Sequence, residues 1–214
     1  MTERIRYKSR AEWLSGRSRG IGASEAAAAT GRSRRMTKID LWKIKTGQKE
    51  APDLSALEYV QRGVRMEGAV RGFFAASHPE LKIYHHPFDI LFQSERPWLF
   101  ATLDGETLER QSGEQGIIEI KNVQPRSRDE WIKWDHSVPD EYYDQILHQH
   151  LATRRNKIWL VAALWHMDGD VTLREFFFDF LADEGLRQDA AWVLLKEEIM
   201  WDCIEQRRIP SITI

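Results

Sequence analysis

Cysteine and long apolar runs are scarce in this sequence. Cys203 is the only cysteine among 214 residues, so no disulfide can form within the chain and no zinc or iron–sulfur site can be built from several cysteines. The longest unbroken apolar run, residues 158–165, is too short to cross a bilayer, and the first residues contain no apolar signal-peptide core. These absences predict a cytoplasmic protein that does not enter a membrane.

Low-complexity tracts, internal repeats and obvious linkers are also missing, which favours a single domain over residues 1–214. The composition, 42% apolar and 30% charged, is typical of a globular chain. The net charge of −2 hides an asymmetry, because residues 1–49 carry 13 Lys or Arg against 4 Asp or Glu, whereas the remainder carries 18 against 29. A basic N-terminal part suits a polyanionic partner, and an acidic remainder suits carboxylates that hold cations.

Helix signals dominate both ends of the chain, and strand signals dominate its middle. Ser24 and Thr37 are expected to cap short helices that end near Gly31 and Gly47, and a capping-box pattern from Ser55 predicts a long helix. Strands are expected over residues 81–84, 88–92, 98–103, 106–109 and 117–121, then helices from about 127 and 139, strands over 158–165 and 171–180, and a helix over 182–207. In that last helix the expected buried positions are Leu186, Val193, Leu194, Ile199 and Ile204. This order predicts a mixed α/β domain with a central sheet flanked by helices.

Two short segments carry the residues on which a chemical interpretation depends. They are Asp104, at the end of one expected strand, and residues 118–121, on the next. Because side chains alternate along a strand, Glu119 and Lys121 point to one face and the two isoleucines point into the core. If the segments are neighbours, Asp104 joins Glu119 in an oxygen site suited to Mg²⁺, and the lysine beside it suits phosphodiester hydrolysis. An ordinary solvated strand face is the alternative for the Glu-x-Lys pair taken alone.

The surrounding segments resemble the lambda-exonuclease and YqaJ-type viral recombination nucleases, which belong to the PD-(D/E)xK nucleases. The resemblance rests on short motifs in the expected order: Trp13 with Arg17-x-x-x-Ile21-Gly22-Ala23-Ser24-Glu25, Asp40-Leu41-Trp42 with Lys45-Thr46-Gly47, Arg62-Gly63-x-x-x-Glu67, Asp104 with Glu119-x-Lys121, and Tyr142-Tyr143-Asp144-Gln145-Ile146. One departure is Leu103, which stands where the core motif has proline. That proline is not a ligand, so its replacement is not expected to remove activity.

The resemblance implies a restriction-endonuclease-like fold and assigns roles to the matching residues. Asp104, Glu119 and the Ile120 main-chain carbonyl would bind Mg²⁺, for which Mn²⁺ could substitute. Glu67 would supply a further carboxylate near the metal. Lys121 would be the catalytic lysine, and Gln145 would reach the same cleft.

The same resemblance implies a pocket for a terminal 5′-phosphate, formed by Arg17, Ser24 and Thr102. An arginine offers a forked donor for phosphate, and a hydroxyl at a helix N-terminus adds a donor where the helix dipole favours an anion. Simple helix capping is the alternative role for Ser24. We also expect basic residues of the next loop to contact the DNA backbone without sequence preference, and these are Arg32, Arg34 and Arg35.

The activity implied by the resemblance is a Mg²⁺-dependent exonuclease that degrades one strand of double-stranded DNA from its 5′ end. The 3′ overhangs would serve phage-type recombination by single-strand annealing. A homotrimeric ring, a single-strand annealing protein as partner, and a phage or prophage origin in a bacterial host are implied in the same way. Two alternatives stay open. An endonuclease on the same core needs no phosphate pocket beside the metal. A DNA-binding module with an inactive nuclease fold does not need the intact Asp104, Glu119 and Lys121.

Overall fold

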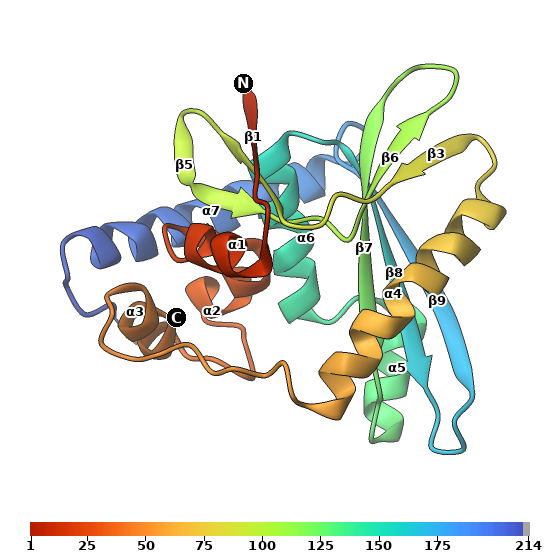
Figure 1. Ribbon diagram of the computed structural model, residues 1–214, viewed down its shortest axis with the longest axis horizontal. Coiled ribbons are helices and arrows are strands. Elements are labelled where there is room, and N and C mark those ends of the chain that lie inside the picture. The colour runs from red at the N-terminus through yellow and green to blue at the C-terminus, as the bar shows by residue number, and fades with distance from the viewer. Residues whose placement is uncertain (212–214) are drawn as a thin grey trace.

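The structure is a computed structural model, and it describes residues 1–211 (Figure 1). Its first part contains β1 (Thr2–Arg6), α1 (Arg10–Arg17), β2 (Ile21–Gly22), the 3₁₀ turn η1 (Ala23–Glu25), α2 (Ala26–Thr30) and α3 (Lys38–Lys45). The middle contains α4 (Glu58–Ser77), β3 (Leu81–Tyr84), β4 (Asp89–Gln93), β5 (Arg96–Ala101), β6 (Gly105–Glu109) and β7 (Gln115–Val123). The last part contains α5 (Arg128–His136), α6 (Asp140–Thr153), β8 (Lys157–Trp165), β9 (Val171–Asp179) and α7 (Glu184–Glu205).

The strands form two mixed sheets, with strand orders β1-β4-β5-β2 and β3-β6-β7-β8-β9. In the larger sheet the central strand β7 pairs antiparallel with β6 and parallel with β8. The expected mixed α/β architecture with a central mixed sheet flanked by helices is confirmed, and the second, smaller sheet is an addition that the sequence did not indicate. The smaller sheet was missed because β2 is only two residues long and β1 pairs with β4, some ninety positions further along the chain.

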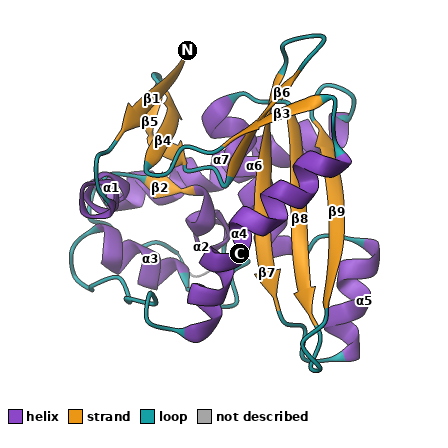
Figure 2. Ribbon diagram, turned by 45° about the vertical axis from the view of Figure 1, so that its right-hand side comes forward, coloured by secondary structure: helices purple, strands orange, loops and turns teal. Residues whose placement is uncertain are grey.

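Helices α4 and α6 cover opposite faces of the larger sheet (Figure 2). Val70 and Phe74 of α4 pack with Ile118 and Ile120, which confirms that these two isoleucines enter the core. The other face of β7 is turned toward α6, whose buried residue Ile146 belongs to a separate core cluster. The same helix also contacts β5, α2 and α7, so it lies between the two sheets. Alternation along β7 therefore directs Glu119 and Lys121 toward α6.

The helix starts show where local signals hold and where they fail. Thr37 caps α3 as expected, since its side chain accepts a hydrogen bond from the backbone N–H of Asp40. The predicted capping box at Ser55 is wrong: α4 begins at Glu58 and has no side-chain cap. The backbone N–H of Ser55 instead donates to Asp53 at 2.9 Å, which turns the chain before the helix starts.

The two longest helices, α4 and α7, both present charged side chains along their length. Among residues 1–211 no helix is long and apolar enough to span a bilayer. Of the expected buried positions of α7, Leu186, Val193 and Ile204 are buried, but Ile199 is 51% exposed, so that prediction is wrong. Helix α7 packs against α2, α3 and α6, and Ile199 lies on the side of the helix that faces solvent.

Candidate active site

Acidic and basic side chains meet where β7 runs past the start of β6. Gly105, the first residue of β6, pairs with Ile118, so the edge of β7 beyond this point faces the residue before Gly105, which is Asp104. Asp104 Oδ2 accepts a hydrogen bond from the backbone N–H of Ile120 at 2.9 Å. Because the N–H and C=O of one strand residue point to the same side, the Ile120 carbonyl faces the same edge. The residues predicted as the core of the site are thus neighbours in space.

Glu119 is held by three donors from β7 and α6. Its Oε1 accepts from Lys121 Nζ at 2.7 Å and from Gln145 Nε2 at 2.6 Å, and its Oε2 accepts from Gln149 Nε2 at 2.5 Å. Lys121 Nζ also donates to Gln145 Oε1 at 2.7 Å and lies 5.1 Å from the ring centroid of Tyr142. The carboxylate and the ammonium are therefore fixed relative to each other.

Burial and the interactions between charged groups shift the pKa values of the carboxylates and the lysine at this site. Burial, together with the nearby Glu119, raises the pKa of Asp104 well above its ordinary value, although Lys121 opposes the shift. Burial lowers the pKa of Lys121, but attraction to Glu119 and Asp104 outweighs it, and the pKa is raised. Burial also raises the pKa of Glu67, which Arg71 opposes. The carboxylates of Asp104, Glu119 and Glu67 thus lie near only two cationic side chains, those of Lys121 and Arg71. This excess of acidic groups favours a bound cation.

Helix α4 is tied to the Asp104 turn through Arg71, a residue that the sequence did not single out. Arg71 Nη1 donates to the main-chain oxygen of Asp104 at 2.9 Å and lies 3.8 Å from Glu67 Oε2. His85 Nδ1 donates to the same Asp104 oxygen at 3.1 Å. The only local signal for this link is the four-residue spacing of Glu67 and Arg71, which places both on one helix face.

The donor set fits a hydrated Mg²⁺ better than a cage of side chains. No three His, Cys, Asp or Glu side chains within the described part of the chain are arranged to hold a metal ion by themselves. Asp104 and Glu119 would hold the ion together with oxygens of another kind, which are the Ile120 carbonyl and solvent, and Mg²⁺ usually keeps several waters. Beside Glu119, the buried Oε1 of Gln149 has no hydrogen-bond partner among the described residues, so an acceptor for such a water is present.

The three residues predicted to bind a terminal phosphate are connected through Trp13. Arg17 Nη2 donates to Ser24 Oγ at 3.0 Å, and its guanidinium lies 4.9 Å from the ring centroid of Trp13 and 5.6 Å from that of Phe100. Trp13 Nε1 donates to Thr102 Oγ1 at 3.1 Å. Since both hydroxyls accept a hydrogen bond, each keeps its own proton for donation to an anion. Burial lowers the pKa of Arg17, so an anion there would compensate a poorly solvated cation.

The predicted capping role of Ser24 is wrong. Helix α2 follows Glu25, which makes no side-chain cap, and Ser24 lies in η1 and accepts from Arg17 instead. Glu25 Oε2 accepts from the backbone N–H of Gly22 at 2.9 Å and pairs with Lys45 Nζ at 2.7 Å. Lys45 Nζ also donates to the main-chain oxygen of Arg17 at 3.1 Å. These contacts hold the loop that carries Ser24 against the end of α1.

Thr102, one of the three residues predicted to bind a terminal phosphate, is close to the carboxylates along the chain. Thr102 is two positions before Asp104, so their Cα atoms lie at most about 7 Å apart. Both follow β5, whose Leu99 and Phe100 pair in parallel with β2. The chain just after β5 therefore carries a hydroxyl predicted to bind an anion and, two positions later, a candidate cation ligand.

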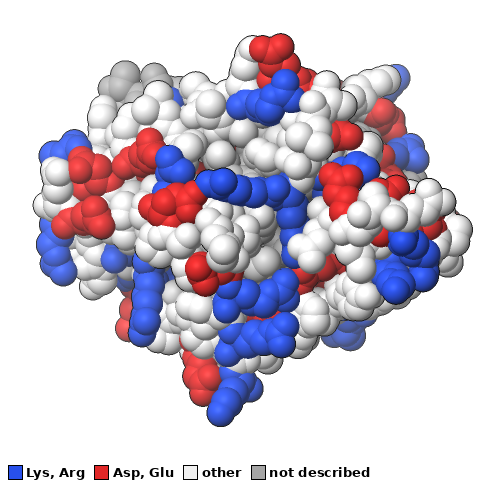
Figure 3. Space-filling view, turned by 90° about the horizontal axis from the view of Figure 1, so that it is seen from above, with Lys and Arg blue, Asp and Glu red and all other residues white. Residues whose placement is uncertain are grey.

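The basic loop before α3 is placed as expected, but its arginines differ in their contacts. Arg32 Nη1 pairs with the buried Asp144 at 3.0 Å, and its guanidinium lies 4.3 Å from the ring centroid of Trp192. Arg34 and Arg35 are exposed. Viewed from above, the surface shows Lys and Arg groups across its middle with acidic groups interspersed (Figure 3). Contact of these arginines with DNA stays a prediction.

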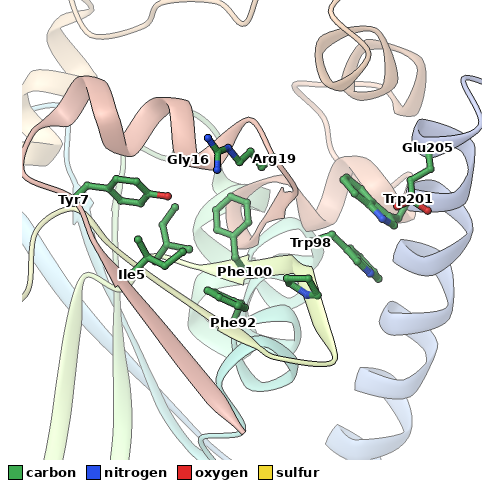
Figure 4. Close-up of a pocket in the computed structure, with 11 residues that line it drawn as sticks. Ile5, Tyr7, Gly16, Arg19, Phe92, Trp98, Phe100, Trp201 and Glu205 are labelled. Carbon is green, nitrogen blue, oxygen red and sulfur yellow. The ribbon is translucent and has the colours of Figure 1, made fainter.

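A cavity of about 320 Å³ lies between α1, the smaller sheet and α7, and Phe100 is part of its wall (Figure 4). Its walls are mostly apolar and aromatic, and they include Trp98 and Trp201, whose rings stack at 5.5 Å. None of the predicted catalytic residues lines it. The cavity therefore does not mark the candidate active site.

Gln149 of α6 also contacts Glu119, and the sequence did not single it out. It follows Gln145 by four positions, a spacing that places both amides on one helix face. The sequence signal was present but weak, because a glutamine pair at this spacing is common on ordinary helices. The partner Glu119 lies on a different element, and only the fold brings them together.

Comparison with known proteins agrees with this arrangement. Residues 12–156 match the family model of the YqaJ-like viral recombinase domain. The uncharacterized protein YqaJ of Bacillus subtilis (strain 168) is 31% identical over 140 residues, which cover 65% of this chain and 41% of that protein, so the match spans less than half of the relative's length.

Two solved structures share the fold. The alkaline exonuclease LHK-Exo of Laribacter hongkongensis superposes with a TM-score of 0.58 at 16% identity, covering 92% of this chain and 97% of that chain. LHK-Exo in complex with dAMP gives a TM-score of 0.54 at 18% identity, with the same coverage. The expected restriction-endonuclease-like fold is confirmed by this likeness.

Proposed function

This chain belongs to the YqaJ-like viral recombinase family, and we propose that it is a metal-dependent deoxyribonuclease that degrades double-stranded DNA from a 5′ end. The observation that carries the proposal is the convergence of Asp104, Glu119 and Lys121 at one edge of β7. The alkaline exonuclease LHK-Exo, which shares the fold, supports the same activity class. The YqaJ relative, which is uncharacterized, supports the family and not the reaction.

The chain's own groups suit phosphodiester hydrolysis. An ammonium has three donors, and Lys121 uses two of them on Glu119 and Gln145, so one N–H is left for a phosphate oxygen or the attacking water. Asp104, Glu119 and the Ile120 carbonyl supply oxygen ligands for Mg²⁺ or Mn²⁺. Such a cation polarises the phosphodiester and lowers the pKa of water. Glu67 adds a further carboxylate near this group.

An end-dependent enzyme is favoured over an endonuclease by the position of the Arg17 pocket. Arg17, Ser24 and Thr102 offer several N–H and O–H donors next to the Asp104 turn. A terminal phosphate bound there places the first phosphodiester bonds of the strand near the carboxylates. Digestion in this direction leaves 3′ overhangs, the substrate of single-strand annealing. A homotrimeric ring, an annealing partner protein and a cytoplasmic setting in a phage-carrying bacterium are parts of the proposal that come from the family resemblance.

The direction of digestion tests the proposal. Linear duplex DNA labelled at one 5′ end or one 3′ end is incubated with Mg²⁺, Mn²⁺ or EDTA. We expect early release of 5′-labelled mononucleotide with either metal, late release of the 3′ label, and no release in EDTA. Release of the 3′ label first would refute the proposed polarity. Binding of DNA without any release would favour the inactive binding module.

A further inference from the structure

The geometry points to a residue that orients the Glu119 carboxylate for binding a cation. We propose that Gln149 is a positioning residue that restricts Glu119 to binding a cation through one oxygen. This inference rests on the function proposed above, because it takes Glu119 as a cation ligand. It concerns Gln149, which lies within residues 12–156 of the family match but is not among the short motifs quoted from the sequence.

The hydrogen bonds of Glu119 leave it one free position. An ionised carboxylate has about four lone-pair sites. Lys121 and Gln145 occupy two of them on Oε1, and Gln149 occupies one on Oε2. The remaining lone pair is on Oε2, the oxygen that Gln149 contacts. The direction in which Glu119 can bind a cation is therefore set by the Gln149 amide.

Burial and packing restrict the movement of the Gln149 amide. Its side chain is 0% exposed, and it follows Gln145 by one turn of α6, so both amides approach Glu119 from the same helix face. The main-chain oxygen of Gln149 also accepts from Thr153 Oγ1 at 2.7 Å. Packing on all sides removes the alternative rotamers that an exposed glutamine would have. A partner of this kind that orients a metal ligand is commonly needed for full metal affinity.

The side-chain oxygen of Gln149 lacks the hydrogen bond that a buried acceptor usually has. Gln149 Oε1 is buried and has no hydrogen-bond partner among the described residues. A buried acceptor without a donor is unfavourable. It lies in the same amide group that contacts Oε2 of Glu119, so it suits a donor that arrives with the cation. The hydration waters that Mg²⁺ retains are donors of this kind.

Gln93 provides a matched control elsewhere in the molecule. It lies on β4, is 2% exposed, and likewise has an Oε1 without a partner among the described residues. Its Nε2 donates to Thr2 Oγ1 at 2.8 Å and to the main-chain oxygen of Ala152 at 3.1 Å. Gln93→Met therefore removes the same buried amide without touching the carboxylates.

The experiment measures Mn²⁺ affinity without DNA, by electron paramagnetic resonance of free Mn²⁺, in the wild type, Gln149→Met and Gln93→Met. Methionine keeps the length of glutamine but cannot donate to Glu119. We expect Gln149→Met to bind Mn²⁺ about 10- to 100-fold more weakly, and Gln93→Met to bind like the wild type. DNA digestion by Gln149→Met should need correspondingly more Mg²⁺ and recover when Mg²⁺ is raised. A purely structural role would not shift the metal requirement.

A second variant covers the case in which Gln149→Met does not fold. Gln149→Asn keeps an amide but is too short to reach Glu119 Oε2, and it should weaken Mn²⁺ binding in the same way. If either folded variant binds Mn²⁺ as tightly as the wild type, the inference is wrong, while wild-type digestion of DNA with Mg²⁺ would leave the proposed function standing. If the wild type neither binds Mn²⁺ nor digests DNA, both fail together.

Discussion

Replacing Lys121 with methionine should destabilise the metal-free protein strongly, because it leaves Glu119 without its cationic partner in a buried setting. The side chains of the pair are 16% and 3% exposed, and their N–O distance is 2.7 Å. Removing one partner of a buried ion pair costs about 3–5 kcal/mol. For a chain of this size that loss corresponds to a fall in Tm of roughly 6–20 °C.

A surface pair gives the matched control. Lys157 pairs with Glu114 at 2.7 Å, but their side chains are 27% and 29% exposed. Lys157→Met should therefore cost less than about 1 kcal/mol. Thermal unfolding followed by circular dichroism in EDTA measures both variants.

A divalent cation should partly replace the missing charge. Mg²⁺ is therefore expected to raise the Tm of Lys121→Met more than that of the wild type, although we expect this variant not to digest DNA. If Lys121→Met unfolds in EDTA at the same temperature as Lys157→Met, the buried ion pair does not hold the site together, and the reasoning is refuted.

Three further predictions follow from other parts of the structure. Arg17→Ala should reduce the preference for a 5′-phosphate over a 5′-hydroxyl end by about 10- to 100-fold, since a hydrogen bond to a charged group contributes about 1.5–3 kcal/mol; competition between the two ends measures it. Burial lowers the pKa of His78, but hydrogen bonds to two glutamates outweigh it and raise the pKa. The stability that His78 adds is thus fully present below its unfolded pKa of about 6.5 and is lost as pH rises through the raised folded value, so His78→Gln should flatten the dependence of Tm on pH there. Gly116→Ala should destabilise by about 1–3 kcal/mol, because its Cβ would lie 2.7 Å from the main-chain oxygen of Lys157; urea unfolding measures it.

Each of these predictions has a control in the same chain. Arg19→Ala changes an exposed arginine close to Arg17 and should keep the phosphate preference. His136→Gln changes an exposed histidine and should leave the pH dependence of Tm as in the wild type. Gly72→Ala places a Cβ in open space on α4 and should stabilise by about 0.5–1 kcal/mol. Loss of the phosphate preference in Arg19→Ala, an unchanged pH dependence in His78→Gln, or a Gly116→Ala protein as stable as Gly72→Ala would each contradict the corresponding prediction.

Local patterns predicted the parts of the fold that depend on neighbouring residues. Thr37 caps α3 as expected, and the helix expected from about residue 127 is present as α5 with Ser127 as its cap, because a cap needs only the three residues that follow. The two-residue period of β7 correctly separated Glu119 and Lys121 from the isoleucines, because alternation is a property of the strand itself. The hairpin between β6 and β7 then brought Asp104 to the same edge.

The remaining errors concern contacts between distant segments. Ser24 has the features of a cap, but Arg17 donates to its hydroxyl instead, and Lys45 of α3 holds the two segments together through Glu25 and the main-chain oxygen of Arg17. Gln149 and Arg71 reach the carboxylates from helices whose packing no local pattern specifies. The roles that family resemblance assigns to Asp104, Glu119 and Lys121 are consistent with their contacts, and they stay predictions until the activity is measured.

The most direct test of the central claim uses linear duplex DNA with a 5′-phosphate or a 5′-hydroxyl end and a closed circular duplex, each with Mg²⁺ and with EDTA. The account predicts rapid loss of the phosphorylated linear DNA with Mg²⁺ alone, slower loss of the hydroxyl form, and a circle that survives. Cleavage of the circle would contradict the end-dependent reaction and favour an endonuclease on the same carboxylates. Loss of DNA in EDTA would contradict the metal-dependent chemistry assigned to Asp104 and Glu119.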